Sequence, residues 1–313
     1  MVIVALFAYS AEAAKPAKKP AKPANPAKQE QKAAPTGGPI KIEGFDTPES
    51  VVSDGRFFYV SNMGKELKPQ AKDGDGYVSL LSPDGKILRK KLLPQNGFFN
   101  SPKGLIVAGA YLYVADVDMI YGYYLPTGKQ MFKMDFSKES TTFLNAFAKK
   151  DDSTLFVSST DTGKIFEVTI RGKTGYKLLI DGLKGPNGLK YDAAAKKLYV
   201  VGWGKDSQPN GEVGVVDLNG AAPVYKSVTT YKGYLDGVVL TSDGKKLVFS
   251  DWVRFEKMGW LRTCDVATGA ISEVKLSEPI GGPADFFYDA ATGKLWIPMM
   301  MEGKVLVEKP SGF

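Results

Sequence analysis

The chain has 313 residues, a formal net charge of +7, a single cysteine and no histidine. The lack of histidine excludes Ser-His-Asp and Cys-His catalysis and histidine-ligated zinc, so any chemistry must use other groups. The lone Cys264 excludes an internal disulfide, and we expect it to lie in the core as a small apolar residue.

Residues 1–14 (MVIVALFAYSAEAA) join a short apolar run to a small-residue ending, which is typical of the later part of a secretory signal peptide. The run is too short to cross a bilayer, which needs roughly 20 apolar residues. No cysteine follows the run, which argues against a lipoprotein. We therefore predict a periplasmic or secreted protein, cleaved near Ala11 to Ala14, with no stable membrane anchor after cleavage.

Residues 15–39 are dense in lysine and proline and contain almost no apolar residue except alanine. Such a stretch buries too little surface to offset the entropy of ordering it, so we predict a disordered linker. Its lysines would suit a basic arm for nucleic acid or another anionic surface. An Ala-Pro-Lys composition is more often a soluble spacer, and we expect no nucleic-acid partner.

Residues 40–313 contain one strand motif, small-apolar-aromatic-apolar, six times. The six copies are FFYVSN (57–62), YLYVAD (111–116), TLFVSS (154–159), KLYVVG (197–202), KLVFSD (246–251) and KLWIPM (294–299). Each alternates with period two and is rich in β-branched and aromatic residues, as strands require. A shorter apolar strand precedes each copy, and turns such as Asp54-Gly55 and Asp243-Gly244 join the two.

These preceding strands begin at residues 49, 103, 145, 187, 236 and 284, a spacing of 42 to 54 residues. That spacing matches the roughly 40–50 residues of a four-stranded propeller blade. A glycine often opens a third strand after the second, as in DGYVSL (75–80) and EGKVLV (302–307). We predict an all-β, six-bladed β-propeller of four-stranded antiparallel blades, a monomer in which IKIEGF (40–45) completes the last blade.

The innermost strand of every blade lines the central channel, so equivalent positions should converge on the axis. One register gives Glu49, Lys103, Asn145, Asn187, Asp236 and Ala284, with Asp285 beside the last. Two carboxylates and two amides form an all-oxygen cluster of the kind that Ca²⁺ or another hard divalent cation prefers. Singly, Asn187-Gly188 and Asp236-Gly237 are also common turn dipeptides. Jointly, the shared register favours a metal site.

Four sequence phrases carry a resemblance to a known family. They are PES (48–50), LNAFA (144–148), GPNGLKYDAAAKKLYV (185–200) and LDGVVLTSDGKKLVFSDW (235–252). They resemble blade starts of the gluconolactonase/regucalcin (senescence marker protein) family, whose relatives include diisopropylfluorophosphatase and paraoxonase. The resemblance implies a six-bladed propeller that hydrolyses lactones, esters or organophosphates with a divalent ion. It also implies a ligand set of Glu49, Asn145, Asn187 and Asp236, with Asp236 as base or nucleophile.

Two features depart from that family. Lys103 occupies the ring, where its ammonium would either pair with Glu49 and compete with a cation, or point aside and hold Glu49 in place. A channel histidine that some relatives use is missing. Met299, Met300 and Met301 suggest an apolar rim, although a methionine cluster also suits a soft metal such as Cu(I).

Two functions fit these observations. In the first, a metal-dependent hydrolase acts on a small-molecule lactone or ester, with Asp236 as the catalytic group. Substrate would then contact Lys103, Trp203, Trp252 and Met300. In the second, a non-catalytic exported propeller binds a small ligand, a glycan or a protein partner. The long insertion 63–75 of the first blade is either a lid over the channel or a solvated charged loop.

Overall fold

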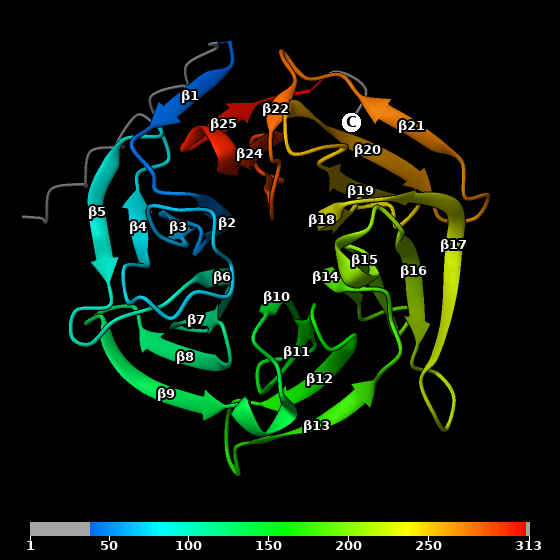
Figure 1. The fold of residues 1–313 in the computed structure, drawn as a ribbon, viewed down its shortest axis with the longest axis horizontal. Coiled ribbons are helices and arrows are strands. Elements are labelled where there is room, and N and C mark those ends of the chain that lie inside the picture. Colours follow the sequence, from blue (N-terminus) through cyan, green and yellow to red (C-terminus); the bar gives the residue numbers. More distant parts are fainter. Residues whose placement is uncertain (1–37, 311–313) are drawn as a thin grey trace, which may run out of the picture. The chain divides into compact units, whose positions relative to one another are not determined.

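Alternating apolar and polar residues, punctuated by turns, fold into six antiparallel sheets arranged around one axis (Figure 1). The computed structural model describes residues 38–310, which belong to a compact unit of residues 37–313. The predicted signal peptide (1–14) lies outside the described residues, as does nearly all of the predicted linker (15–39). The six-bladed fold predicted from the repeat is confirmed, and three short 3-10 turns are the only helical elements of the described chain.

Each blade runs outward from the channel through four antiparallel strands, which are consecutive in the chain in every blade except the last. The innermost strands are β2 (Pro48–Ser53), β6 (Pro102–Ala108), β10 (Leu144–Lys149), β14 (Pro186–Asp192), β18 (Leu235–Leu240) and β23 (Phe287–Asp289). The second strands are β3 (Phe58–Asn62), β7 (Tyr111–Asp116), β11 (Thr154–Ser159), β15 (Lys197–Gly202), β19 (Lys246–Asp251) and β24 (Lys294–Met299). The second strands coincide with the six repeated motifs to within one residue.

The outer half of each blade is more exposed. The third strands are β4 (Tyr77–Leu81), β8 (Met119–Tyr124), β12 (Lys164–Thr169), β16 (Gly211–Asp217), β20 (Lys257–Asp265) and β25 (Lys304–Glu308). The outermost strands are β5 (Ile87–Leu93), β9 (Lys129–Asp135), β13 (Gly175–Ile180), β17 (Val224–Gly233), β21 (Ile271–Val274) and β1 (Ile40–Glu43). A short β22 (Ile280–Gly281) also pairs with β20. The 3-10 turns are η1 (Ser137–Glu139), η2 (Lys205–Ser207) and η3 (Met300–Glu302).

The ring closes where the two ends of the described chain share one sheet. Strand β1 pairs antiparallel with β25, with Ile40 opposite Val307 and Ile42 opposite Val305. Figure 1 shows β1 in blue beside β25 in red. The prediction that IKIEGF (40–45) completes the last blade is therefore confirmed.

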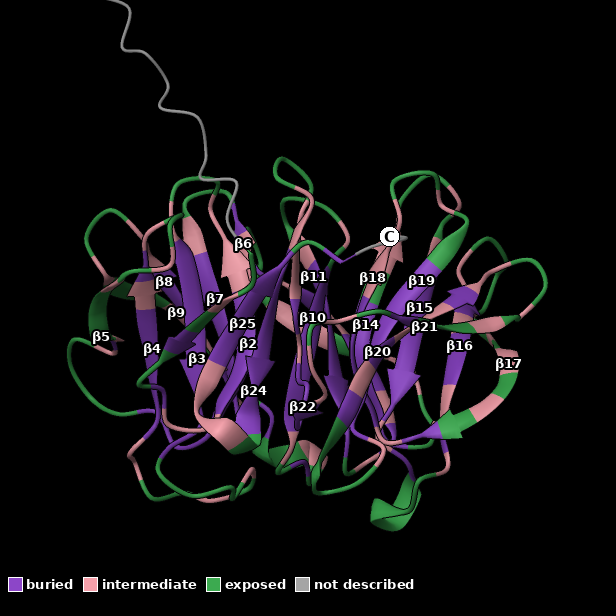
Figure 2. Cartoon of the chain, turned by 90° about the horizontal axis from the view of Figure 1, so that it is seen from above, coloured by how far each residue is buried: buried purple, intermediate pink, exposed green. Residues whose placement is uncertain are grey.

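The core lies between the faces of adjacent blades. Phe58 of β3 stacks on Trp296 of β24 with ring centroids 3.8 Å apart, which joins the first blade to the last. Figure 2 shows buried residues concentrated in the strands and exposed residues in the loops at both ends. Cys264 is fully buried and unpaired, as its sequence context predicts. No helix within residues 38–310 is long and apolar enough to cross a membrane.

One strand departs from the prediction. The innermost strand of the last blade begins at Phe287, so Ala284 and Asp285 precede it instead of opening it. The reason is a competing partner, because the Asp285 N–H donates to the Glu49 carbonyl at 2.9 Å and Val51 N–H donates back to Asp285 at 3.1 Å. Backbone groups expected to pair within the last blade thus pair with the first blade instead.

Candidate functional site

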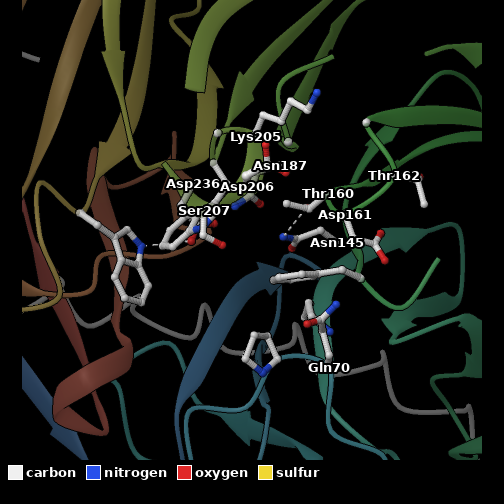
Figure 3. A pocket seen from close by; sticks show the side chains of 18 of the residues that line it. Gln70, Asn145, Thr160, Asp161, Thr162, Asn187, Lys205, Asp206, Ser207 and Asp236 are labelled. Carbon is white, nitrogen blue, oxygen red and sulfur yellow. Dashed lines mark hydrogen bonds between the residues drawn. The ribbon is translucent and has the colours of Figure 1, made fainter. Parts of the chain in front are cut away.

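A β-bulge recurs at the same place in the innermost strand of five blades. The register shifts lie between Pro48 and Val51, Pro102 and Leu105, Leu144 and Phe147, Pro186 and Leu189, and Leu235 and Val238. The first residue inside each bulge is Glu49, Lys103, Asn145, Asn187 and Asp236, respectively. A bulge re-aims the side chain it carries. All five side chains line one pocket of about 610 Å³, and Figure 3 labels Asn145, Asn187 and Asp236 among them.

Glycines behind these side chains let the innermost strands approach one another closely. A Cβ on Gly188 would lie 2.1 Å from the Asp236 carbonyl oxygen, and one on Gly237 would lie 2.7 Å from the Asp285 Cα. A hydroxyl of a second strand also links neighbouring blades, since Ser158 Oγ of β11 donates to the Asn187 carbonyl of β14 at 2.7 Å. The Asn-Gly and Asp-Gly dipeptides therefore serve packing around the channel.

Substituting Gly188 by alanine should destabilise the propeller by about 2–3 kcal/mol, because the added methyl group overlaps the Asp236 backbone and strands must move apart. Gly175→Ala in β13 is the matched control, since nothing lies within 4 Å of a Cβ there. Urea unfolding of the two variants beside the parent measures the difference. Equal stability of Gly188→Ala and Gly175→Ala would contradict the close approach.

Four oxygen atoms at the ring have no hydrogen-bond partner in the described chain. They are Glu49 Oε2, Asn145 Oδ1, Asn187 Oδ1 and Asp236 Oδ1. Their residues are only 2–3% exposed, so an unpaired oxygen there is costly. The four atoms come from four blades and belong to the side chains that share one register.

In two of the four side chains the other polar atom is hydrogen-bonded, which fixes the direction of the free oxygen. Asn145 Nδ2 donates to Thr160 Oγ1 at 3.2 Å. The Trp252 indole N–H donates to Asp236 Oδ2 at 3.1 Å. Figure 3 shows both hydrogen bonds in the pocket. The remaining lone pairs form an oxygen donor set that fits a hard cation.

The donor set is half amide and half carboxylate. Within residues 38–310, no three histidine, cysteine, aspartate or glutamate side chains lie together as a metal cluster. Any ion held here would therefore need the two asparagines as well as Glu49 and Asp236. Water or substrate would have to complete the 6–8 oxygen ligands usual for Ca²⁺.

Burial shapes the protonation of the ring carboxylates. Burial raises the pKa of Glu49 well above its ordinary value, and the charges of Asp236 and Asp285 raise it further, whereas Lys103 lowers it. Burial and Asp285 also raise the pKa of Asp236, against hydrogen bonds from Trp252 and Asn187. The pKa of Asp285 rises to about 6, because burial outweighs the hydrogen bond from Ser50. The ring thus holds its negative charges at a cost that a cation would remove.

Lys103 does not form an ion pair with Glu49. Its Nζ donates to the Ser101 carbonyl at 2.8 Å and lies 4.9 Å from the centroid of the Phe143 ring. No carboxylate oxygen of the described residues lies within 4.0 Å of Lys103 Nζ, which is the distance limit for an ion pair. The side chain has no exposed surface, and this burial lowers its pKa to about 8. Of the two orientations considered from sequence, the structure shows the ammonium pointing aside.

Aromatic side chains form one wall of the pocket. Trp203 packs edge-on against Trp252 with ring centroids 5.0 Å apart, and Phe255 lies 5.8 Å from Trp203. Phe255 is 51% exposed and follows Val253, whose φ of 59° is strained for a β-branched residue. Met300 lines this pocket as well. Phe255 had no signal in the sequence, because it lies in an irregular loop.

Polar side chains of other blades line the opposite part of the pocket. Asp161 accepts hydrogen bonds from Thr141 and Thr142, and Thr160 to Thr162 face the same space (Figure 3). Asp206 and Ser207 also line it, and both have positive φ values of 56° and 52°. Sequence reasoning missed these loop residues, since only the strands repeat from blade to blade.

The insertion 63–75 reaches over the pocket. Its Leu67, Pro69 and Gln70 line the cavity. Gln70 Nε2 donates to Thr142 Oγ1 at 2.7 Å, and Lys72 pairs with Asp118 at 2.6 Å. The insertion of the first blade therefore bonds to loops of the next two blades and partly covers the pocket.

The three consecutive methionines do not converge. Met299 is fully buried in the core between blades, Met300 lines the pocket and Met301 is 41% exposed. This arrangement does not offer a soft metal three thioether ligands.

Comparisons with known proteins establish the fold and no family. No family model matches the sequence, and a search of curated proteins finds no match. Among solved structures, virginiamycin B lyase from Staphylococcus aureus matches with a TM-score of 0.58 and 14% identity, over 86% of this chain and 98% of that one. At such identity the likeness shows a shared β-propeller fold.

Two further solved structures match in the same way. A protein provisionally named 6-phosphogluconolactonase from Bacteroides uniformis has a TM-score of 0.56 and 14% identity, over 85% of this chain and 86% of that one. Hydrazine synthase from Kuenenia stuttgartiensis has a TM-score of 0.57 and 16% identity, over 82% of this chain and 75% of that one. The three neighbours carry different names, and at these identities they share only the fold with this chain.

Proposed function

We propose that this propeller is a divalent-metal-dependent hydrolase of a lactone or ester, with Ca²⁺ as the preferred ion at the mouth of its channel. The observation that carries the proposal is the set of four buried, unpartnered oxygens from four blades. The resemblance of the blade starts to the gluconolactonase/regucalcin family supports it. So does the fold shared with the provisionally named phosphogluconolactonase.

Glu49, Asn145, Asn187 and Asp236 would hold the ion. When bound, such an ion polarises a carbonyl oxygen and stabilises the negative charge that develops on it. Asp236 is held by Trp252 through Oδ2, which leaves Oδ1 free toward the pocket. With no histidine in the chain, this carboxylate is the group placed to take a proton from water or to attack the carbonyl carbon.

The walls of the pocket would select and shield the substrate. The aromatic wall of Trp203, Trp252 and Phe255 suits an apolar portion, and the 63–75 insertion restricts access of water. Asn145, fixed by Thr160, keeps a constant orientation as substrate enters. The chain's own contribution is therefore a preorganised ring beneath an amphipathic pocket.

Hydrolysis assays on a panel of a simple lactone, an aryl ester and a phosphotriester test this proposal. We expect turnover of at least one substrate in Ca²⁺ and its loss on adding EDTA. Inactivity across the panel, with the ion shown to be bound, would remove the hydrolase and leave a ligand-binding propeller with a structural ion.

Truncating Phe255 should raise KM for the aryl ester by about 3- to 10-fold, because one exposed aromatic contact is removed. The same variant should leave KM for a small aliphatic lactone nearly unchanged. Phe98→Ala is the control, since Phe98 is 62% exposed and does not line the pocket. An equal effect of Phe255→Ala on both substrates would contradict a role in recognising the apolar portion.

A further inference from the structure

One member of the ring is cationic, whereas the other four are two carboxylates and two neutral amides. Five blades contribute equivalent bulge residues, and where four of them place an oxygen-bearing side chain the second blade places Lys103. A register that could have supplied a fifth oxygen ligand therefore supplies a cation.

The Lys103 ammonium is held in place in a buried position beside the pocket. The side chain is fully buried, bonds to the Ser101 carbonyl and lies over the Phe143 ring. The backbone of this corner is fixed in turn by Asp116, which accepts hydrogen bonds from the N–H groups of Asn100 and Ser101. The positive charge thus stays beside the ring whether or not an ion is bound.

A buried charge without a contact ion pair acts on its surroundings at longer range. Asp116, Glu49 and Asp161, in decreasing order of effect, are the acidic groups that act on Lys103. Since the interior screens charge weakly, the ammonium offsets part of the negative potential created by Glu49, Asp236 and Asp285. Its repulsion for an incoming ion grows in proportion to the charge of that ion.

We propose that Lys103 is an electrostatic brake on the ring: it lowers the affinity for cations and discriminates against ions of higher charge. This inference rests on the metal site proposed above and concerns its regulation. Because Lys103 lowers the affinity, the ring exchanges its ion with the surroundings. In Ca²⁺ proteins generally, affinity is set by the count of charged ligands, and Lys103 changes that balance without being a ligand.

Removing the charge tests the brake without any measurement of catalysis. In Lys103→Met, which keeps an apolar stem over Phe143, the affinity for Ca²⁺ should rise about tenfold or more and that for Tb³⁺ by a larger factor. Calorimetry measures Ca²⁺, and Tb³⁺ luminescence sensitised by Trp252, which bonds Asp236, reports the ion in the ring itself. Lys103→Arg, which keeps the charge, should stay close to the parent.

Lys205→Met is the matched control, because Lys205 lines the same pocket but is exposed to screening solvent. It should change either affinity less than about twofold. Unchanged affinities in Lys103→Met, with the parent protein binding Ca²⁺, would overturn the brake and leave the metal site standing. No binding to the parent would overturn both. If Lys103→Met fails to fold, Lys103→Gln replaces it, and failure of both would show that the ammonium holds the ring together instead.

Discussion

Asp236→Asn should weaken Ca²⁺ binding by about 100-fold or more and abolish hydrolysis, while the metal-free protein becomes at least as stable as the parent. The weaker Ca²⁺ binding and the higher stability without metal have one cause. The carboxylate is 3% exposed and its charge is opposed by burial and by Asp285, so removing that charge relieves the empty ring. The asparagine still offers an oxygen to the Trp252 indole, which preserves the packing.

Thermal unfolding in EDTA measures the stability of the metal-free protein, and unfolding in Ca²⁺ measures the stabilisation by the ion. Parent protein should gain about 2.7 kcal/mol at a Ca²⁺ concentration 100 times the dissociation constant, and Asp236→Asn should gain almost nothing. Asp206→Asn is the control, because Asp206 lines the pocket but is exposed and lies outside the ring. If Asp236→Asn loses stability in EDTA and keeps the full stabilisation by Ca²⁺, the proposed role of Asp236 is contradicted.

In EDTA, stability should fall as pH rises from 5 to 7.5, and Ca²⁺ should largely abolish this slope. The pKa of Asp285 rises from 3.8 to about 6 on folding, and those of Glu49 and Asp236 rise well above their ordinary values. The folded state therefore holds protons that the unfolded chain has released, so stability decreases with pH until each raised pKa is passed. We expect a loss on the order of 1–3 kcal/mol over this window.

Few other groups of the protein titrate between pH 5 and 7.5. The chain has no histidine. Glu212, whose pKa falls to about 2, contributes stability that is lost only below its unfolded value of 4.5. Lys103, with its pKa lowered to about 8, changes stability only at higher pH. Urea midpoints at several pH values measure the slope, and the Glu49→Gln, Asp236→Asn double variant should reduce it to the part that Asp285 contributes. A slope unchanged in that variant would assign the effect to groups other than Glu49 and Asp236.

The repeat made the propeller predictable from sequence. KLYVVG, KLVFSD and their counterparts each form the second strand of a blade, because alternation and turn residues are local properties that survive in every copy. The same periodicity brought Glu49 and Asp236 into one pocket although they are far apart in the chain. The last blade departs from this periodicity at Asp285, whose backbone partners belong to the first blade.

The rest of the site depends on contacts that no repeat encodes. The direction of Lys103 is set by the Ser101 carbonyl and by the Phe143 ring of the next blade, and alternation within one blade does not encode this contact between blades. Phe255 lies in a loop two residues after Val253, and Ser207 lies in the 3-10 turn η2. Val253 and Ser207 both have positive φ values, which the sequence pattern does not reveal. The sequence therefore predicts the ring and three wall residues, Trp203, Trp252 and Met300, whereas the other lining residues and the charge balance required the structure.

The metal content of the purified protein tests the central claim most directly. After dialysis against Ca²⁺ and removal of free ion, elemental analysis should find about one Ca²⁺ per chain in the parent, as expected for one oxygen-lined site, and none in the folded Glu49→Gln, Asp236→Asn double variant. A folded parent without Ca²⁺, or equal content in the two proteins, would show that the four oxygens do not hold an ion.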